Sequence, residues 1–163
     1  MNQKLTVEVQ QGVTKIMSTA HIYASKKEVW DVLKFPGNIA AFHPLIKRSF
    51  MTTQAESGLH AKRHCDLLPM GAMDEVITDW KEGKTFTMEV IGGKMLPPHH
   101  FMKGRIFMRE VGEHTEVSFE LSYRLKFGVI GRLLDRLLIQ PQFKNAPTKY
   151  VQGLKKYVEG NKN

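Results

Sequence analysis

The hydrophobic period changes twice along this chain of 163 residues, and the order of the changes limits the folds that it can adopt. An extended stretch leads into one short helix after Ser25, and strand-like alternation then continues to Phe127. A helical stretch from about Gly128 to Glu159 closes the chain. A sheet that is followed by one long helix can curve around that helix and leave a space between the two. The order of elements therefore predicts an α+β fold with a small-molecule cavity.

The N-terminal part predicts two extended segments and two short helices. Apolar residues alternate in one parity up to Val9 and in the other parity from Ile16, so a bulge or turn is expected near Gly12. Residues 25–28 have the S-x-x-E pattern of a capping box, which begins the first helix. A Phe-Pro-Gly sequence ends that helix, and residues 38–42 predict a second short one.

The middle of the chain predicts an antiparallel meander, because short alternating segments are separated by turn residues. The last of these segments is the clearest. Its apolar residues alternate with charged and hydroxyl residues, so one face is expected to be buried and the other to meet solvent. The predicted strands are Ile46–Gln54, His60–Leu67, Met73–Trp80, Thr85–Ile91, Phe101–Val111 and Thr115–Phe127.

The closing stretch predicts an amphipathic helix with an interruption. Its apolar residues recur at helical spacing from Ile130 to Leu138 and again from Tyr150 onward. Pro141 and Pro147 each lack an N–H group and crowd the preceding turn. The stretch is therefore expected to form either one long helix with a bend or two collinear pieces.

The residues that open the first helix, together with several later segments, resemble the SRPBCC superfamily, also called START-like or Bet v 1-like. Within it, the chain is most similar to the polyketide cyclase/dehydrase and lipid-transport group. The resemblance extends from about Ile16 to Val158. The segments that carry it are residues 24–30, Phe42–Ile46, Gly58–Arg63, Asp74–Ile77 and Met95–Pro98.

This resemblance implies a helix-grip fold. A curved antiparallel sheet of six to seven strands would wrap around the long C-terminal helix, with two short helices after the first strand and an internal apolar cavity. Relatives include lipid carriers, hormone receptors, aromatase/cyclases and chaperone activators, and they share no universal catalytic residue. The chain departs from the usual pattern at Phe42, where relatives often have Trp, and in the His-rich segment Pro97–Phe101.

Length and cysteine content predict one domain over residues 1–163 and a cytoplasmic location. A chain of this size forms one core, and Cys65 is its only cysteine, so no intrachain disulfide can form. The N-terminus has no secretory signal pattern, and no stretch approaches a membrane span. His43, His99 and His100 have no zinc-ligand spacing, and no cofactor motif is present, so neither a metal nor a cofactor is predicted.

The formal net charge of +8 is concentrated near the C-terminus. From Lys126 onward, eight basic residues face only Asp135 and Glu159, which leaves 8 − 2 = +6 in this segment. A solvated outer helix face explains this charge, and attraction to an anionic membrane surface or to nucleic acid is the alternative. No zinc-finger, RNP-type or basic-zipper motif is present, so nucleic acid is not an expected partner. The oligomeric state stays open.

Arg63 and Glu75 are the first candidates for a functional pair. Arg63 lies on the presumed inner parity of its strand, and a hairpin turn at residues 69–71 would bring it opposite or near Glu75. A partly buried pair of this kind either orients a polar ligand group, such as a carboxylate or a phenol, or only fixes the strand register.

Further candidates belong to the predicted cavity wall. His43, in a loop near the expected cavity mouth, joins Arg63 and Glu75 as a possible acid–base group. Flexible thioethers suit an adaptable apolar pocket, although core filling explains the methionines equally well. Tyr123 lies in the inner row of the last strand, where its hydroxyl needs a partner. The predicted ligand-binding residues are His43, Arg63, Glu75, Met88, Met102, Met108, Phe119, Tyr123, Leu134 and Leu138.

Three functions follow from these patterns. The first is a carrier that binds a lipid, quinone, isoprenoid or aromatic polyketide in its cavity. The second is a cyclase/dehydratase-like enzyme, which would need a titratable group that faces the cavity with a shifted pKa. The third is an interaction module of the chaperone-activator or anionic-surface type, which rests on the basic C-terminal segment.

Overall fold

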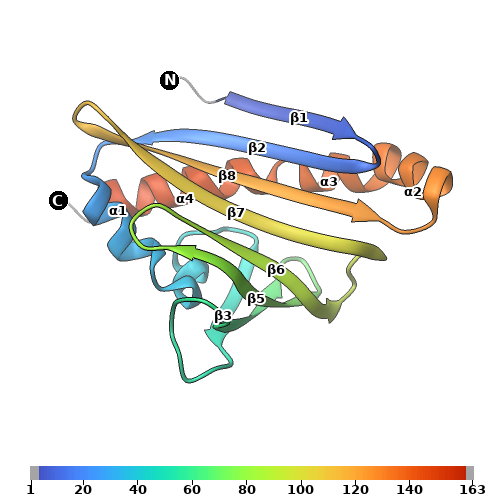
Figure 1. The fold of residues 1–163 in the computed structure, drawn as a ribbon, viewed down its shortest axis with the longest axis horizontal. Helices are drawn as coiled ribbons and strands as arrows, with labels where there is room; N and C mark the ends of the chain where they lie inside the picture. Colours follow the sequence, from blue (N-terminus) through green and yellow to red (C-terminus); the bar gives the residue numbers. More distant parts are fainter. Residues whose placement is uncertain (1–3, 161–163) are drawn as a thin grey trace.

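The computed structural model describes residues 4–160 and contains one eight-stranded antiparallel sheet. The strand order is β1-β2-β8-β7-β6-β5-β4-β3, so only the β2–β8 neighbours are distant in sequence. Figure 1 shows the sheet curving away from the long hairpins β1–β2 and β7–β8. The strands are β1 Lys4–Gln10, β2 Val13–Ile22, β3 Ile46–Met51, β4 Lys62–Leu67, β5 Ala72–Lys81, β6 Thr85–Lys94, β7 His99–Val111 and β8 His114–Leu125.

The N-terminal hairpin shows why the sequence changes parity. Gln11 and Gly12 both have positive φ values and form a tight turn, so the predicted interruption is a turn between two paired strands. The sheet therefore has eight strands rather than six to seven, and the short helices follow the second strand rather than the first. Strand β1 lies at the edge of the sheet, and most of its side chains are exposed.

Two short helices follow β2. Helix α1 (Lys26–Leu33) begins at the predicted capping box: the Ser25 side chain accepts from the Glu28 backbone N–H, and Glu28 accepts from the Ser25 N–H at 2.7 Å. The next helix, η1 (Pro36–Ala41), is of the 3₁₀ type and begins earlier than predicted, with Pro36 in its first turn.

The closing helical stretch is divided into four elements. They are α2 (Gly128–Leu134), the π-type segment η2 (Asp135–Ile139), α3 (Gln140–Phe143) and α4 (Ala146–Gly160). Helix α4 begins one residue before Pro147, a position that proline tolerates, so the break in the stretch lies at residues 144–145. Figure 1 shows the four elements running alongside β2 and β8. The helix-grip architecture predicted from the sequence is confirmed.

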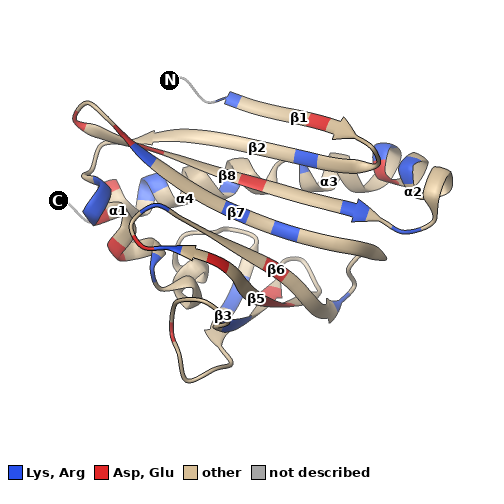
Figure 2. Cartoon of the chain, in the orientation of Figure 1, with Lys and Arg blue, Asp and Glu red and all other residues tan. Residues whose placement is uncertain are grey.

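The first half of this stretch corrects one sequence expectation. Gly131 and Asp135 are the buried residues of α2 and η2, whereas the apolar residues at helical spacing, including Leu134 and Leu138, point outward and are about half exposed. Asp135 accepts hydrogen bonds from Thr14 Oγ1 at 2.6 Å and from Tyr123 Oη at 2.7 Å. A polar anchor, rather than an apolar face, therefore fixes this half to the sheet. Figure 2 shows lysine and arginine positions within this half of the stretch.

Helix α4 supplies the part of the stretch that is buried as predicted. Tyr150, Val151, Leu154 and Val158 pack into the main core with residues of α1, β2 and the central strands. No helix in the described part of the chain is long and apolar enough to cross a bilayer.

A close backbone approach at Gly153 allows α4 to pack against the loop after η1. A Cβ atom at this position would lie 1.9 Å from the Phe42 carbonyl oxygen, which is a backbone atom and cannot rotate away. We therefore expect Gly153→Ala to lower the free energy of unfolding by about 1–3 kcal/mol, the usual cost of overpacking. Urea denaturation measures the change.

The matched control is Gly160→Ala on the same helix. A Cβ atom at Gly160 would meet nothing within 4 Å, so this variant should unfold like the wild type. Equal stability of both variants and the wild type would contradict the proposed approach of the two backbones.

Candidate functional site

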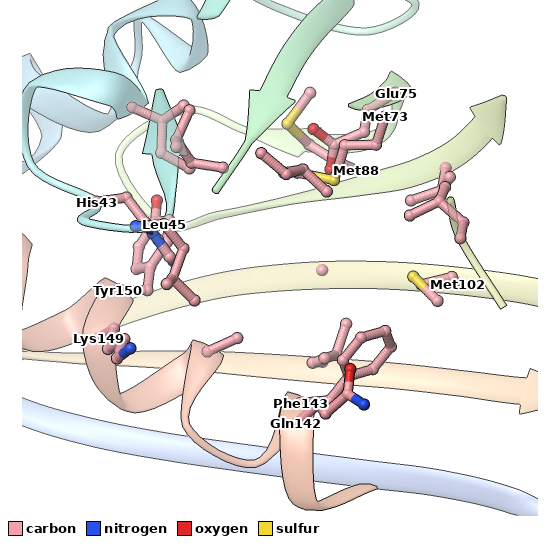
Figure 3. A pocket seen from close by; sticks show the side chains of 18 of the residues that line it. His43, Leu45, Met73, Glu75, Met88, Met102, Gln142, Phe143, Lys149 and Tyr150 are labelled. Atoms are coloured by element: carbon pink, nitrogen blue, oxygen red, sulfur yellow. Dashed lines mark hydrogen bonds between the residues drawn. The ribbon is translucent and has the colours of Figure 1, made fainter. Parts of the chain in front are cut away.

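A cavity of about 790 Å³ lies between the curved sheet and the closing helical stretch. Its walls come from β4 to β8, from the loops after η1, β4 and β6, and from the segment between Ile139 and Tyr150. The volume falls in the range of pockets that hold a small organic ligand. Figure 3 shows side chains from these elements converging on one space.

Most of the cavity wall is apolar. Met73, Met88 and Met102 contribute thioethers from three neighbouring strands, and Phe143 closes the space from α3. Gly104 makes room for the Phe119 ring on this part of the sheet, because a Cβ atom there would meet the ring at 2.8 Å. The wall can therefore surround an apolar ligand with side chains that adapt to its shape.

A buried ion pair lies in the wall formed by β4 and β5. Arg63 and Glu75 are direct partners in the strand register, which confirms the predicted proximity. The Arg63 Nε donates to Glu75 Oε2 at 3.0 Å, Nη2 donates to the same oxygen, and Nη1 donates to the Pro36 carbonyl at 2.7 Å. Burial is the largest single effect and disfavours the charged guanidinium, but the charge of Glu75, the hydrogen bonds to it and the smaller effects of Cys65 and Tyr150 together raise the pKa of Arg63.

One oxygen of this pair is unused. The Nε and Nη2 groups of Arg63 both donate to Glu75 Oε2, and the Cys65 Sγ also lies 3.9 Å from that atom. No described residue donates to Glu75 Oε1, although the whole side chain is buried and lines the cavity. Oε1 is therefore available as an acceptor for a ligand hydroxyl.

His43 lies in the same region of the cavity and is uncharged at neutral pH. Burial, and then the positive charge of Arg63, lower its pKa to about 4, although the backbone of Ala146 opposes the shift. Its Nδ1 accepts from the Leu45 backbone N–H at 3.1 Å, so the proton of the neutral ring is on Nε2. His43 is thus held by the backbone of Leu45, in the loop after η1, and by that of Ala146, at the start of α4.

Tyr150 is a cavity residue that the sequence assigned only to an apolar helix face. Its ring stacks on Phe119 with centroids 4.5 Å apart and meets the edge of Phe42 at 5.3 Å. Burial raises the pKa of its hydroxyl, which keeps the group neutral, and no described residue forms a hydrogen bond with it. Figure 3 shows Tyr150 beside His43 on one wall of the cavity.

The predicted ligand-binding residues separate into two groups. The structure brings His43, Arg63, Glu75, Met88, Met102 and Phe119 together around the cavity. Met108 is instead buried in the main core, Tyr123 donates to Asp135, and Leu134 and Leu138 face outward. The prediction that the first group binds a ligand stays a prediction.

The histidine pair of the His-rich segment lies outside this wall. His99 and His100 are the first residues of β7, at the point where this strand pairs with the end of β8. Among residues 4–160, no group of three histidine, cysteine or acidic side chains is arranged to hold a metal ion.

Comparison with known families gives a match over nearly the whole chain. A family model described as "Polyketide cyclase / dehydrase and lipid transport" matches residues 13–159. Curated protein sequences give no significant match.

Solved structures with low sequence identity have the same fold. The Zhui aromatase/cyclase from a Streptomyces species superposes with a TM-score of 0.77 at 10% identity, covering 93% of this chain and 96% of that protein. A norcoclaurine synthase from Thalictrum flavum gives 0.72 at 14% identity, with coverage of 96% and 100%. A START superfamily protein from Mycobacterium smegmatis gives 0.68 at 14% identity, with coverage of 90% and 98%. Family and fold together support hydrophobic ligand binding or a polyketide cyclase-like function.

The lowered pKa of His43 makes the stability of the protein depend on pH. Between pH 6.5 and about 4, the unfolded chain takes up a proton on this residue while the folded protein does not. Stability contributed by the neutral ring is therefore fully present above pH 6.5 and is lost as the pH falls to 4, by about 3 kcal/mol in total. His43→Asn, which retains an acceptor for Leu45, should remove this component from urea denaturation curves recorded at several pH values.

His100→Asn is the control, because His100 is an exposed histidine outside the cavity wall. It should reproduce the pH dependence of the wild type. If His43→Asn also retained the wild-type dependence, His43 would not be held neutral by the fold.

Proposed function

Since the chain belongs to the polyketide cyclase/dehydrase and lipid transport family, we propose that it binds one hydrophobic small molecule in the cavity. The ligand is of the lipid, quinone, isoprenoid or aromatic polyketide type. One observation carries this proposal: an apolar space of about 790 Å³ has a cluster of buried polar groups in its wall. Burial of the apolar part of the ligand would supply most of the affinity, and the polar groups would set its orientation.

The polar cluster favours an uncharged ligand group. Arg63 and Glu75 neutralise each other, and the pKa shifts keep His43 and Tyr150 neutral. A ligand carboxylate beside Glu75 would meet its negative charge and would gain no hydrogen bond from Arg63, because the guanidinium is directed to Glu75 and to the Pro36 carbonyl. The cavity-lining cation without an ion pair to a described residue is Lys149, which acts on His43. A phenol or alcohol fits better, since it can donate to Glu75 Oε1 or pair with the Tyr150 hydroxyl.

This geometry favours binding over catalysis. A general base needs a free basic atom within reach of the ligand; His43 Nδ1 already accepts from Leu45, which leaves Glu75 Oε1, on a carboxylate paired with Arg63. The raised pKa of Tyr150 also makes its hydroxyl a poor proton donor at neutral pH. The cyclase-like alternative would therefore depend on orientation of the substrate and on Glu75 rather than on His43 or Tyr150.

Filling the cavity should abolish binding. Ala146 lines the cavity at the start of α4, and Ala146→Phe places a ring inside the space. We expect this variant to bind the neutral fluorescent probe phenylnaphthylamine at least about tenfold more weakly, which corresponds to roughly 1.4 kcal/mol. Native mass spectrometry of the freshly purified wild type should reveal a hydrophobic compound that the variant lacks.

Ala55→Phe is the matched control, because Ala55 is exposed in a loop that does not contribute to the cavity. It should bind the probe like the wild type. Equal probe binding by both variants would place the bound molecule elsewhere, and recovery of the ligand in chemically altered form would assign the cavity to catalysis instead.

The polar group of the ligand can be tested with a matched pair of compounds. Tyr150→Phe removes one hydroxyl and retains the ring that stacks on Phe119. Because one hydrogen bond contributes about 0.5–1.5 kcal/mol, we expect affinity for naphthol to fall about 2–10-fold and affinity for naphthalene to remain unchanged. Isothermal titration with each compound measures both values, and equal losses for the two compounds would show that the ring position, not the hydroxyl, had changed.

A further inference from the structure

The start of the closing helical stretch exposes large apolar side chains. Seven apolar residues between the end of β8 and the end of η2 are 43–70% exposed. In a helix on the surface of a globular protein, about three or four apolar residues in every two turns normally face the core. Contiguous apolar surface of this kind marks a contact with another molecule or with a membrane. We call this surface the apolar patch; its residues are Phe127, Val129, Ile130, Leu133, Leu134, Leu137 and Leu138.

The protein-facing side of the same segment explains why the patch remains outside. Gly131, Asp135, Ile139 and Phe143 recur every four residues and together face the sheet or the cavity. Asp135 is held by Thr14 and Tyr123, so a rotation that buried the leucines would break two hydrogen bonds within the protein. The outward position of the apolar patch is therefore fixed by the fold.

The exposed charged residues within this segment are all cations. Lys126, Arg132 and Arg136 are exposed, and none of them forms an ion pair with any described residue. Asp135 is the one acidic residue between Glu120 and Glu159, and its carboxylate is buried. Figure 2 shows positive residues on α2 and at the end of β8, at one end of the molecule. Apolar side chains among exposed cations are typical of helices that lie in a membrane interface.

The apolar patch adjoins the cavity. Ile139 and Phe143, which follow it on the same helical stretch, line the cavity. On the loops after β4 and β6, Leu68, Met70 and Met95 also line the cavity and are themselves exposed. A surface that covered the apolar patch would therefore lie close to a rim of the cavity that is also apolar.

We propose that the apolar patch docks into the surface of an anionic lipid bilayer, with its side chains at the acyl boundary and Lys126, Arg132 and Arg136 against lipid headgroups. Docking would bring the cavity next to the membrane, so that the hydrophobic ligand passes between them; this second step rests on the proposed function. A second copy of the chain fits the apolar patch less well, because pairing would bring the same unpaired cations of two positively charged proteins together.

Vesicle flotation tests the docking. Wild-type protein should float with vesicles of phosphatidylcholine and phosphatidylserine at low salt and should remain behind with phosphatidylcholine alone. Leu133→Gln combined with Leu137→Gln should abolish flotation. Arg132→Gln combined with Arg136→Gln should reduce the partition coefficient on the order of 30-fold, because each cation near an anionic surface contributes about 1 kcal/mol.

Two double variants provide matched controls. Leu5→Gln with Val7→Gln removes exposed apolar groups from β1, and Lys47→Gln with Lys62→Gln removes exposed cations from β3 and β4. Both should float like the wild type, since neither touches the apolar patch. Flotation that every variant retained, or that the control pairs lost equally, would overturn the proposal.

A fluorophore locates the contact directly. Cys65 is buried, so a thiol introduced by Leu137→Cys can be labelled selectively with an environment-sensitive dye. Its emission should shift to the blue on anionic vesicles, and the same dye on Leu5→Cys should not respond. Sedimentation that revealed a dimer, lost in the Leu133 and Leu137 double variant, would assign the apolar patch to a second copy and overturn docking to lipid.

Ligand binding in solution separates this proposal from the proposed function. The Leu133 and Leu137 double variant should bind phenylnaphthylamine like the wild type, because neither residue lines the cavity. Loss of flotation with retained probe binding supports both ideas. Flotation of a wild type that binds no probe would sustain docking and remove the exchange step, whereas probe binding without flotation would remove docking alone.

Discussion

The buried pair between Arg63 and Glu75 is the interaction on which the cavity depends. A guanidinium with this little exposure is stable only with a compensating charge and hydrogen bonds, and Glu75 and the Pro36 carbonyl provide them. The pair joins β4, β5 and η1, so it fixes the end of the sheet that curves around the cavity. It also sets the local electrostatics, because the charge of Arg63 helps to lower the pKa of His43.

The charges of the pair do not make the cavity a site for charged ligands. Each partner cancels the other, so the pair itself presents a single carboxylate oxygen to the space, and the remaining charge in this part of the wall is that of Lys149 near His43. A cavity with a largely apolar wall and such a polar cluster selects a ligand by shape and by one or two hydrogen bonds. The same fold is shared by proteins with 10–14% identity to this chain, so the scaffold alone does not identify the ligand.

Local patterns were sufficient to predict most of the fold. The capping box at Ser25 and the alternation along β8 depend on neighbours in sequence, and the pairing of Arg63 with Glu75 follows from one hairpin. The orientation of α2 could not be predicted in this way. Its apolar spacing indicates a buried face, but the partners that decide its orientation, Thr14 and Tyr123, are on other elements. Tyr150 was missed for a related reason: only the position of Phe119 turns a helix-face tyrosine into a cavity residue.

The π-type segment η2 allows the closing stretch both to bind the sheet through Asp135 and to line the cavity with Ile139 and Phe143. Residues four apart drift by about 40° around an α-helix, so a stripe from Gly131 to Phe143 would soon leave the sheet. A π-type turn takes more residues and reduces this drift. Asp135 can therefore anchor the segment while Ile139 and Phe143 still reach the cavity. Because this side of the segment faces the sheet and the cavity, the leucines between these positions lie on the opposite side and are exposed. The same segment therefore provides both part of the cavity wall and the exposed apolar patch.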